Sequence, residues 1–123
     1  MGRKLSLDAL ARELLEAAVR APAGRAARTA VGGHDTVLRQ TLVALCAGQE
    51  LAEHDNLDEA TVQVLHGRVR LVAGDTEWEG RRGDLIVVPQ ARHRLQAIED
   101  ATVLLTVANL RGPAPTGRVA SGG

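Results

Sequence analysis

Apolar and polar residues alternate along much of this chain, and no other feature of the sequence restricts its fold as strongly. The segments Thr61–Leu65 and Arg68–Val72 both alternate, on either side of His66-Gly67. Successive side chains of a β-strand point to opposite faces, so the alternation predicts a hairpin with one apolar face. Further strand candidates, bounded by turn residues, are Val37–Cys46, Leu85–Val88, His93–Ile98 and Thr102–Val107.

The predicted strands are short and closely spaced. We count about six or seven of them at the ~8–12-residue spacing that is typical of antiparallel sandwiches and barrels. A parallel α/β sheet is disfavoured because no strand candidate is followed by a long helical pattern. The sequence therefore predicts an all-β sandwich or barrel.

The N-terminal segment has a helical period instead. Its apolar residues recur at the spacing of one helix face, and they are Leu7, Leu10, Ala11, Leu14 and Ala18. Ser6 is a suitable N-cap, and we expect the helix to end near Arg20, before Pro22. The sequence thus predicts one short helix before the β-structure.

With 123 residues, the chain has the length of one domain. We expect a helix and linker over residues 1–24 and a β-barrel over residues 25–110. Gly, Pro, Ser and Thr are frequent over residues 111–123, which predicts a disordered tail.

Composition and charge exclude several classes of function. Aromatic residues make up 1% of the chain, which argues against stacking platforms for single-stranded nucleic acid and against aromatic cages for cations. The 15 basic and 15 acidic residues cancel, so nothing indicates a nucleic-acid partner or an anionic membrane partner. The single cysteine, Cys46, excludes a disulfide within the chain, and its apolar neighbours predict that it is buried.

The same sequence favours a bacterial, cytoplasmic protein. Lys4 is the only lysine among many arginines, which is typical of a GC-rich genome. No apolar stretch approaches the ~18 residues of a membrane span, and no signal-peptide pattern is evident.

Histidines are the best candidates for chemistry, and they are His34, His54, His66 and His93. His54 and Asn56 stand two residues apart, so on a strand they would share one face. We expect His66 at the rim of the barrel and His34 in a loop. Trp78, alone between charged residues, is expected to pack internally or at a subunit interface.

Gly48, His54 and Gly67 follow one another at a recognisable spacing. This spacing resembles the first motif of the cupin superfamily, with its opening glycine, first histidine and closing glycine. The sequence departs from that motif at the second histidine, which is Asn56 here, and at the glutamate, which is Ala60.

Gly83 and Pro89 resemble the start of the second cupin motif, and His93 is the histidine nearest to the motif's position. Here the departures are Ala91 and Ala97. The resemblance covers roughly residues 37–107 and implies a cupin-type jelly-roll β-barrel with a short N-terminal helix.

Metal-binding cupins hold a divalent ion with three histidines and one glutamate. Carried over residue by residue, only His54 and His93 match that set. Glu59 adjoins the glutamate position, and a one-residue bulge would turn its carboxylate inward. Two histidines and one carboxylate suit iron(II), and Asn56 would add a weak oxygen ligand. The cofactor is therefore either absent or a divalent transition metal.

The first functional hypothesis is a small-molecule-binding barrel with a degenerate or absent metal site. Its polar residues, His54, Asn56 and His93, would orient a ligand by hydrogen bonds. The apolar part of that ligand would lie against Val62, Val64 and Leu95.

Two alternatives stay open. One is a metal-dependent cupin enzyme of the dioxygenase, isomerase or decarboxylase type, in which His54, His93 and Glu59 hold the ion. The other is a structural or regulatory homodimer that associates through its helix or a sheet edge.

Overall fold

The computed structural model of the protein describes residues 2–33, 35–54 and 58–108, with only the backbone described for residues 52–54. Nine strands and one helix lie within this part of the chain. In chain order the elements are α1 (Leu7–Arg20), β1 (Arg25–Val31), β2 (Leu38–Leu45), β3 (Glu50–His54), β4 (Glu59–His66), β5 (Arg68–Ala73), β6 (Thr76–Arg81), β7 (Leu85–Val88), β8 (His93–Ala97) and β9 (Ala101–Ala108). The predicted tail over residues 111–123 lies outside the described residues.

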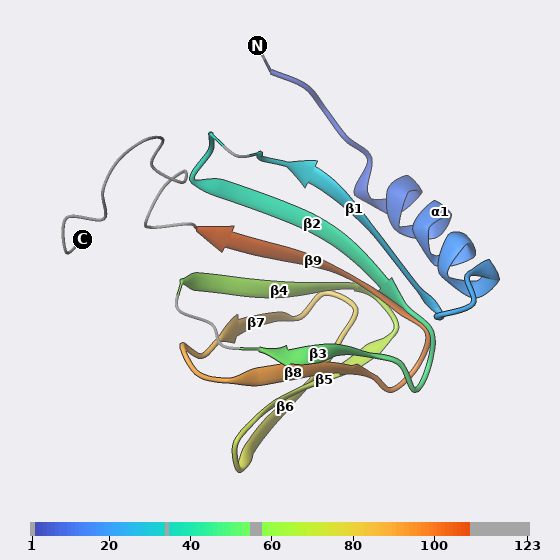
Figure 1. The fold of residues 1–123 in the computed structure, drawn as a ribbon. Helices are drawn as coiled ribbons and strands as arrows, with labels where there is room; N and C mark the ends of the chain where they lie inside the picture. Colours follow the sequence, from blue (N-terminus) through green and yellow to red (C-terminus); the bar gives the residue numbers. More distant parts are fainter. Residues whose placement is uncertain (1, 34, 55–57, 109–123) are drawn as a thin grey trace.

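The strands form two antiparallel sheets that pack face to face (Figure 1). The larger sheet has the order β1-β2-β9-β4-β7, and the smaller has the order β3-β8-β5-β6. β9 lies at the centre of the larger sheet because it pairs with both β2 and β4. This all-β architecture confirms the fold class that the alternation predicts.

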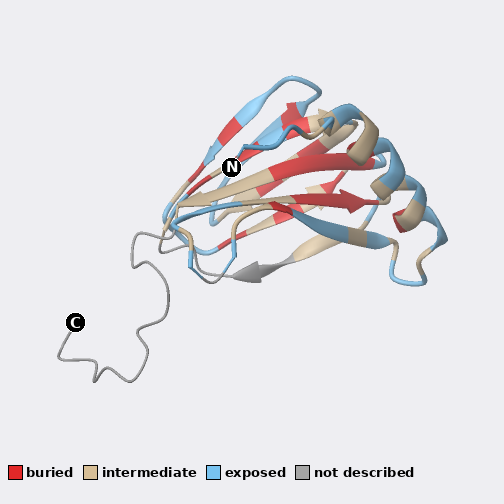
Figure 2. Ribbon diagram, turned by 90° about the horizontal axis from the view of Figure 1, so that it is seen from above, coloured by how far each residue is buried: buried red, intermediate tan, exposed pale blue. Residues whose placement is uncertain are grey.

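The core lies between the two sheets and is aliphatic. Val62 and Val64 of β4 are buried, whereas their neighbour Gln63 is exposed, as the alternation predicts. Leu71 of β5 and Leu95 of β8 supply the facing layer from the smaller sheet. Figure 2 shows the buried residues along the strands, with the loops and much of the helix exposed.

Helix α1 covers part of the outer face of the larger sheet (Figure 1). It begins at the predicted N-cap, where the Ser6 hydroxyl accepts a hydrogen bond from the Ala9 amide at 3.3 Å. Its apolar side packs on a second, smaller cluster with Leu42 and Leu104. The Thr102 hydroxyl, fully buried, donates to the Ala11 carbonyl oxygen at 3.4 Å and ties β9 to the helix.

Strand β1 is the element that the alternation does not reveal. It is an edge strand, and small or polar residues occupy both of its faces, for example Ala27 and Arg28, which are exposed. Only Ala30 is buried in it, beneath the helix. Its position depends on its backbone pairing with β2, which no pattern of apolar residues records.

From the sequence, residues 80–84 are predicted to form a turn and Cys46 to be buried, and the structure corrects both predictions. Gly80 lies inside β6, where a Cβ would stand 3.1 Å from side-chain atoms of Val64 and Ile86. The turn follows it, and the Arg81 amide donates to the Asp84 carboxylate at 2.9 Å. Cys46 is half-buried rather than buried, because β2 ends at the preceding residue.

Within the described segments, α1 is too short and too polar to span a lipid bilayer.

Gly67 provides a test of this packing. Its φ is +77°, and a Cβ there would collide with the carbonyl oxygen of Asp100 in the β8–β9 loop. Gly67→Ala should lower the free energy of unfolding by about 3 kcal/mol or more, because the loop must move.

Gly74→Ala is the matched control, since its φ is +59° and its Cβ would meet no atom within 4 Å. The control should lose only ~1 kcal/mol, from the left-handed conformation. Urea denaturation measures both, and equal losses would contradict the close approach.

Candidate functional site

One end of the sandwich collects the residues that the motifs single out. At this end β2, β4 and β8 begin, and β7 and β9 end (Figure 1). We call it the mouth and define it by the inner-face residues Arg39, Ala60, Val88, His93 and Val107. The register supports this grouping across the larger sheet. Ala60 is the Cα partner of both Val88 and Val107, and Val107 is also the partner of Arg39.

His93 lies at the mouth on the smaller sheet. It shares its face with Leu95 and Ala97 of the core and is only 7% exposed. Its Nδ1 lies 3.0 Å from the Ala91 carbonyl oxygen. Since a carbonyl oxygen can only accept, Nδ1 is the donor of this hydrogen bond. The Ala91 carbonyl oxygen thus holds the imidazole ring by its Nδ1 side.

The backbone brings His54 opposite His93. His54 of β3 and His93 of β8 are Cα partners, and so are Leu51 and Leu95. Between these two pairs β3 advances by three residues and β8 by only two. One extra residue in β3 absorbs this difference, as in a β-bulge. The two histidines of the motifs are therefore neighbours in the sheet. The side chain of His54 and the whole of Asn56 lie outside the described residues.

Three residues expected to line a ligand pocket belong instead to the packed core, and they are Val62, Val64 and Leu95. None of them is more than 4% exposed. Two cavities are described in the structure, and these residues line neither of them. Aliphatic side chains from both sheets occupy this part of the interior.

Glu59 does not turn inward. Its side chain is exposed, and it pairs with Ala108 in an unbroken register that continues through Ala60 and Thr61. The bulge that a metal ligand at Glu59 would need is therefore missing. Ala60, which stands at the family's glutamate position, is the residue on the inner face. Across the described side chains, no group of three or more His, Cys, Asp and Glu gathers where it could hold a metal.

The sequence reasoning missed a polar group on the other sheet of the mouth. Arg39 and Thr41 follow the parity of Val43 and Leu45, which are buried in the core, so they lie on the inner face of β2. Thr29 of β1 is the Cα partner of Thr41. All three line a cavity of about 220 Å³. Their parity with the buried residues of the same strand is the signal that could have found them.

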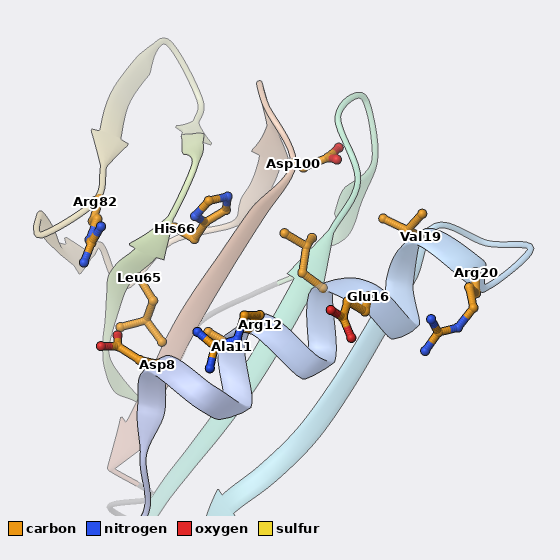
Figure 3. Close-up of a pocket in the computed structure, with 11 residues that line it drawn as sticks. Asp8, Ala11, Arg12, Glu16, Val19, Arg20, Leu65, His66, Arg82 and Asp100 are labelled. Atoms are coloured by element: carbon orange, nitrogen blue, oxygen red, sulfur yellow. The ribbon is translucent and has the colours of Figure 1, made fainter.

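A larger cavity of about 590 Å³ lies outside the barrel, as a groove between α1 and β4. Figure 3 shows its lining side chains, with Leu65 directed toward the helix and His66 further along β4. His66 is exposed and lies beside this groove, so it is not part of the mouth. Charged side chains of both signs border the groove, among them Arg12 and Glu16.

Comparison with solved structures gives many matches. A conserved protein of unknown function from Streptococcus pyogenes is 30% identical, with a TM-score of 0.62, over 68% of this chain and 73% of that one. An RmlC-like cupin protein from Desulfovibrio desulfuricans is 27% identical, with a TM-score of 0.60, over 69% of this chain and 82% of that one.

An enzyme also matches. A salicylate 1,2-dioxygenase from Pseudoaminobacter salicylatoxidans is 26% identical, with a TM-score of 0.64, over 82% of this chain. This chain spans only 31% of the dioxygenase.

No protein-family model matches the sequence, and no curated protein sequence matches it. The two-sheet topology, the paired histidines and the matching solved structures nevertheless agree with the resemblance in the motifs. The chain is a member of the cupin superfamily.

Proposed function

We propose that this cupin binds a small molecule at the mouth of its barrel, with His93 as the polar contact. The observation that carries the proposal is the burial of His93 on the inner face of β8, beside the core residues Leu95 and Ala97. Among the described residues only one other polar side chain is buried, Thr102, and its hydroxyl is used to hold the helix. Burying a polar group destabilises a fold unless the group is hydrogen-bonded. The Ala91 carbonyl oxygen supplies such a hydrogen bond to His93, and a role in ligand binding would account for an imidazole at this end of the sheet.

The surroundings of His93 support the same proposal. Leu105 and Val107, at the mouth end of β9, are only partly buried, although residues further along the strand, such as Val103, are fully buried. Half-exposed aliphatic side chains beside a fixed polar group are typical of small-molecule sites. In this proposal the ligand lies at the mouth and does not enter the packed interior around Val62 and Val64.

A metal-dependent cupin enzyme is the second candidate. The pairing of His54 with His93 favours it, as does the likeness to a salicylate 1,2-dioxygenase. The described residues do not complete a donor set, because the carboxylate of Glu59 is on the outer face. We therefore derive no reaction step through a metal.

A homodimer is a further candidate, on the evidence of β7. Leu85 and Val87 are 60% and 72% exposed, on the outer face of the edge strand β7. Apolar side chains on an exposed strand edge commonly mark an association surface.

The binding proposal predicts stabilisation by a ligand. A panel of small metabolites should contain compounds that raise the thermal midpoint. A compound at a hundredfold excess over its Kd adds ~2.7 kcal/mol to the free energy of unfolding, or about 10 °C for a domain of this size. His93→Asn keeps a hydrogen-bond donor near the Nδ1 position but removes Nε2, so it should abolish the shift. His66→Asn, outside the mouth, should keep it. A shift that survives in His93→Asn would overturn the proposal.

The position of Glu59 predicts the outcome of a metal analysis. Glu59→Gln should leave the metal content of untagged protein unchanged, because the carboxylate lies on the outer face. Elemental analysis of wild type, Glu59→Gln and His93→Asn measures this directly. A near-stoichiometric metal that both substitutions remove would replace the binding proposal with the enzyme candidate.

The exposed edge of β7 predicts an effect on association. If the chain dimerises through this strand, Val87→Lys should give a monomer in multi-angle light scattering. Its thermal midpoint should change little, because the side chain is already exposed. Val19→Lys is the matched control, since Val19 is 61% exposed but lies on α1. A dimer that persists in Val87→Lys would exclude this surface.

A further inference from the structure

The charge at the mouth lies on the sheet opposite His93. Arg39 stands on the inner face of β2, two residues before Thr41, and Thr41 pairs with Thr29 of the neighbouring strand. These three residues, with Val31, Gly32 and Gly33, line the cavity of about 220 Å³. One arginine and two threonines therefore border the same small space.

Arg39 makes no ion pair and no side-chain hydrogen bond with any residue that the structure describes. The arginines on the outer face of the smaller sheet differ, because Arg68 and Arg70 contact Glu79 at 3.6 and 3.2 Å. The contrast matters because a guanidinium presents five donors in a planar fork that fits a carboxylate. Arg39 keeps these donors available at the edge of an aliphatic face.

The register connects this polar group to the apolar part of the mouth. Arg39 pairs with Val107, and Thr41 pairs with Leu105. Val107 in turn pairs with Ala60. An aliphatic strip therefore begins beside Arg39 and runs across the larger sheet, while His93 lies on the inner face of the smaller sheet.

We propose that the ligand of the mouth is a small monocarboxylic acid. Its carboxylate accepts hydrogen bonds from Arg39 and from the hydroxyls of Thr29 and Thr41, and its apolar part lies on Leu105 and Val107. This inference rests on the binding function proposed above and specifies its ligand. A single guanidinium, with no second cation among the described residues of the cavity lining, fits a monoanion better than a phosphate dianion. The cavity is also smaller than the ~300–1,000 Å³ of a typical drug-sized site.

The test is calorimetric titration of the whole chain with two acids and their neutral amides: benzoate against benzamide, and isovalerate against isovaleramide. At least one acid should bind more tightly than its amide. Arg39→Gln should weaken binding of that acid about tenfold or more, because charged hydrogen bonds are lost, and should leave the amide unaffected. Arg28→Gln is the matched control, since Arg28 is exposed on the outer face of adjacent β1. It should bind the acid as wild type does.

The outcomes separate this inference from the binding function itself. If an acid and its amide bind equally to wild type and to Arg39→Gln, the inference that the ligand is a carboxylic acid is overturned. The mouth remains the binding site in that case if His93→Asn weakens the binding of both compounds. Equal weakening by Arg39→Gln and Arg28→Gln would show only a general effect of charge and would overturn the inference. Failure of both acids to bind would overturn it too. Because Arg39 is exposed, the variant should keep the thermal midpoint of wild type.

Discussion

The packing of two aliphatic sheet faces against each other is the interaction on which the rest of this structure depends. The chain contains no Phe or Tyr, so Leu, Val, Ile and Ala must fill the space between the sheets. β9 anchors the larger sheet at its centre, and residues such as Val103 are buried almost completely. Inner positions that are not aliphatic weaken this packing. Polar residues at such positions therefore need a separate explanation.

His93 and Arg39 are two polar residues at such inner positions. Both lie at the mouth end of their strands, on opposite sheets, and both follow the parity of core residues. His93 is held by the Ala91 carbonyl, and Arg39 lines a small cavity. The proposed site joins these two observations: a small acid would be held by its charge on one sheet and face an imidazole on the other.

Much of the fold could be predicted from the sequence because strand and helix periods are local. The helix with its Ser6 cap, the hairpin around Gly67 and the strand before Pro89 all follow from spacing. β1 could not be predicted, since an edge strand covered on only part of one face needs no alternation. Its existence depends on pairing with β2, which is a tertiary property.

The candidate site could be predicted only in part. The motifs find His93, and the sheet register then places His54 beside it. The motifs cannot tell on which face of the sheet Glu59 lies, because a single bulge would move its side chain to the other face. Only the strand register shows that β4 has no bulge at Glu59. Nor does alternation show whether inward residues such as Val64 enclose a cavity or fill it. That depends on the separation of the sheets and on the sizes of the facing side chains. Arg39 is the opposite case, since its parity with Val43 could have been read directly.

The location of the ligand is the central claim, and amide chemical-shift mapping by ¹H–¹⁵N NMR tests it most directly. Adding a monocarboxylate that binds the protein should shift the backbone amide signals of Thr29, Arg39, Thr41 and His93. Signals around the groove beside α1, such as those of Arg12 and His66, should stay in place. Shifts centred on that groove, with the mouth unchanged, would contradict the account.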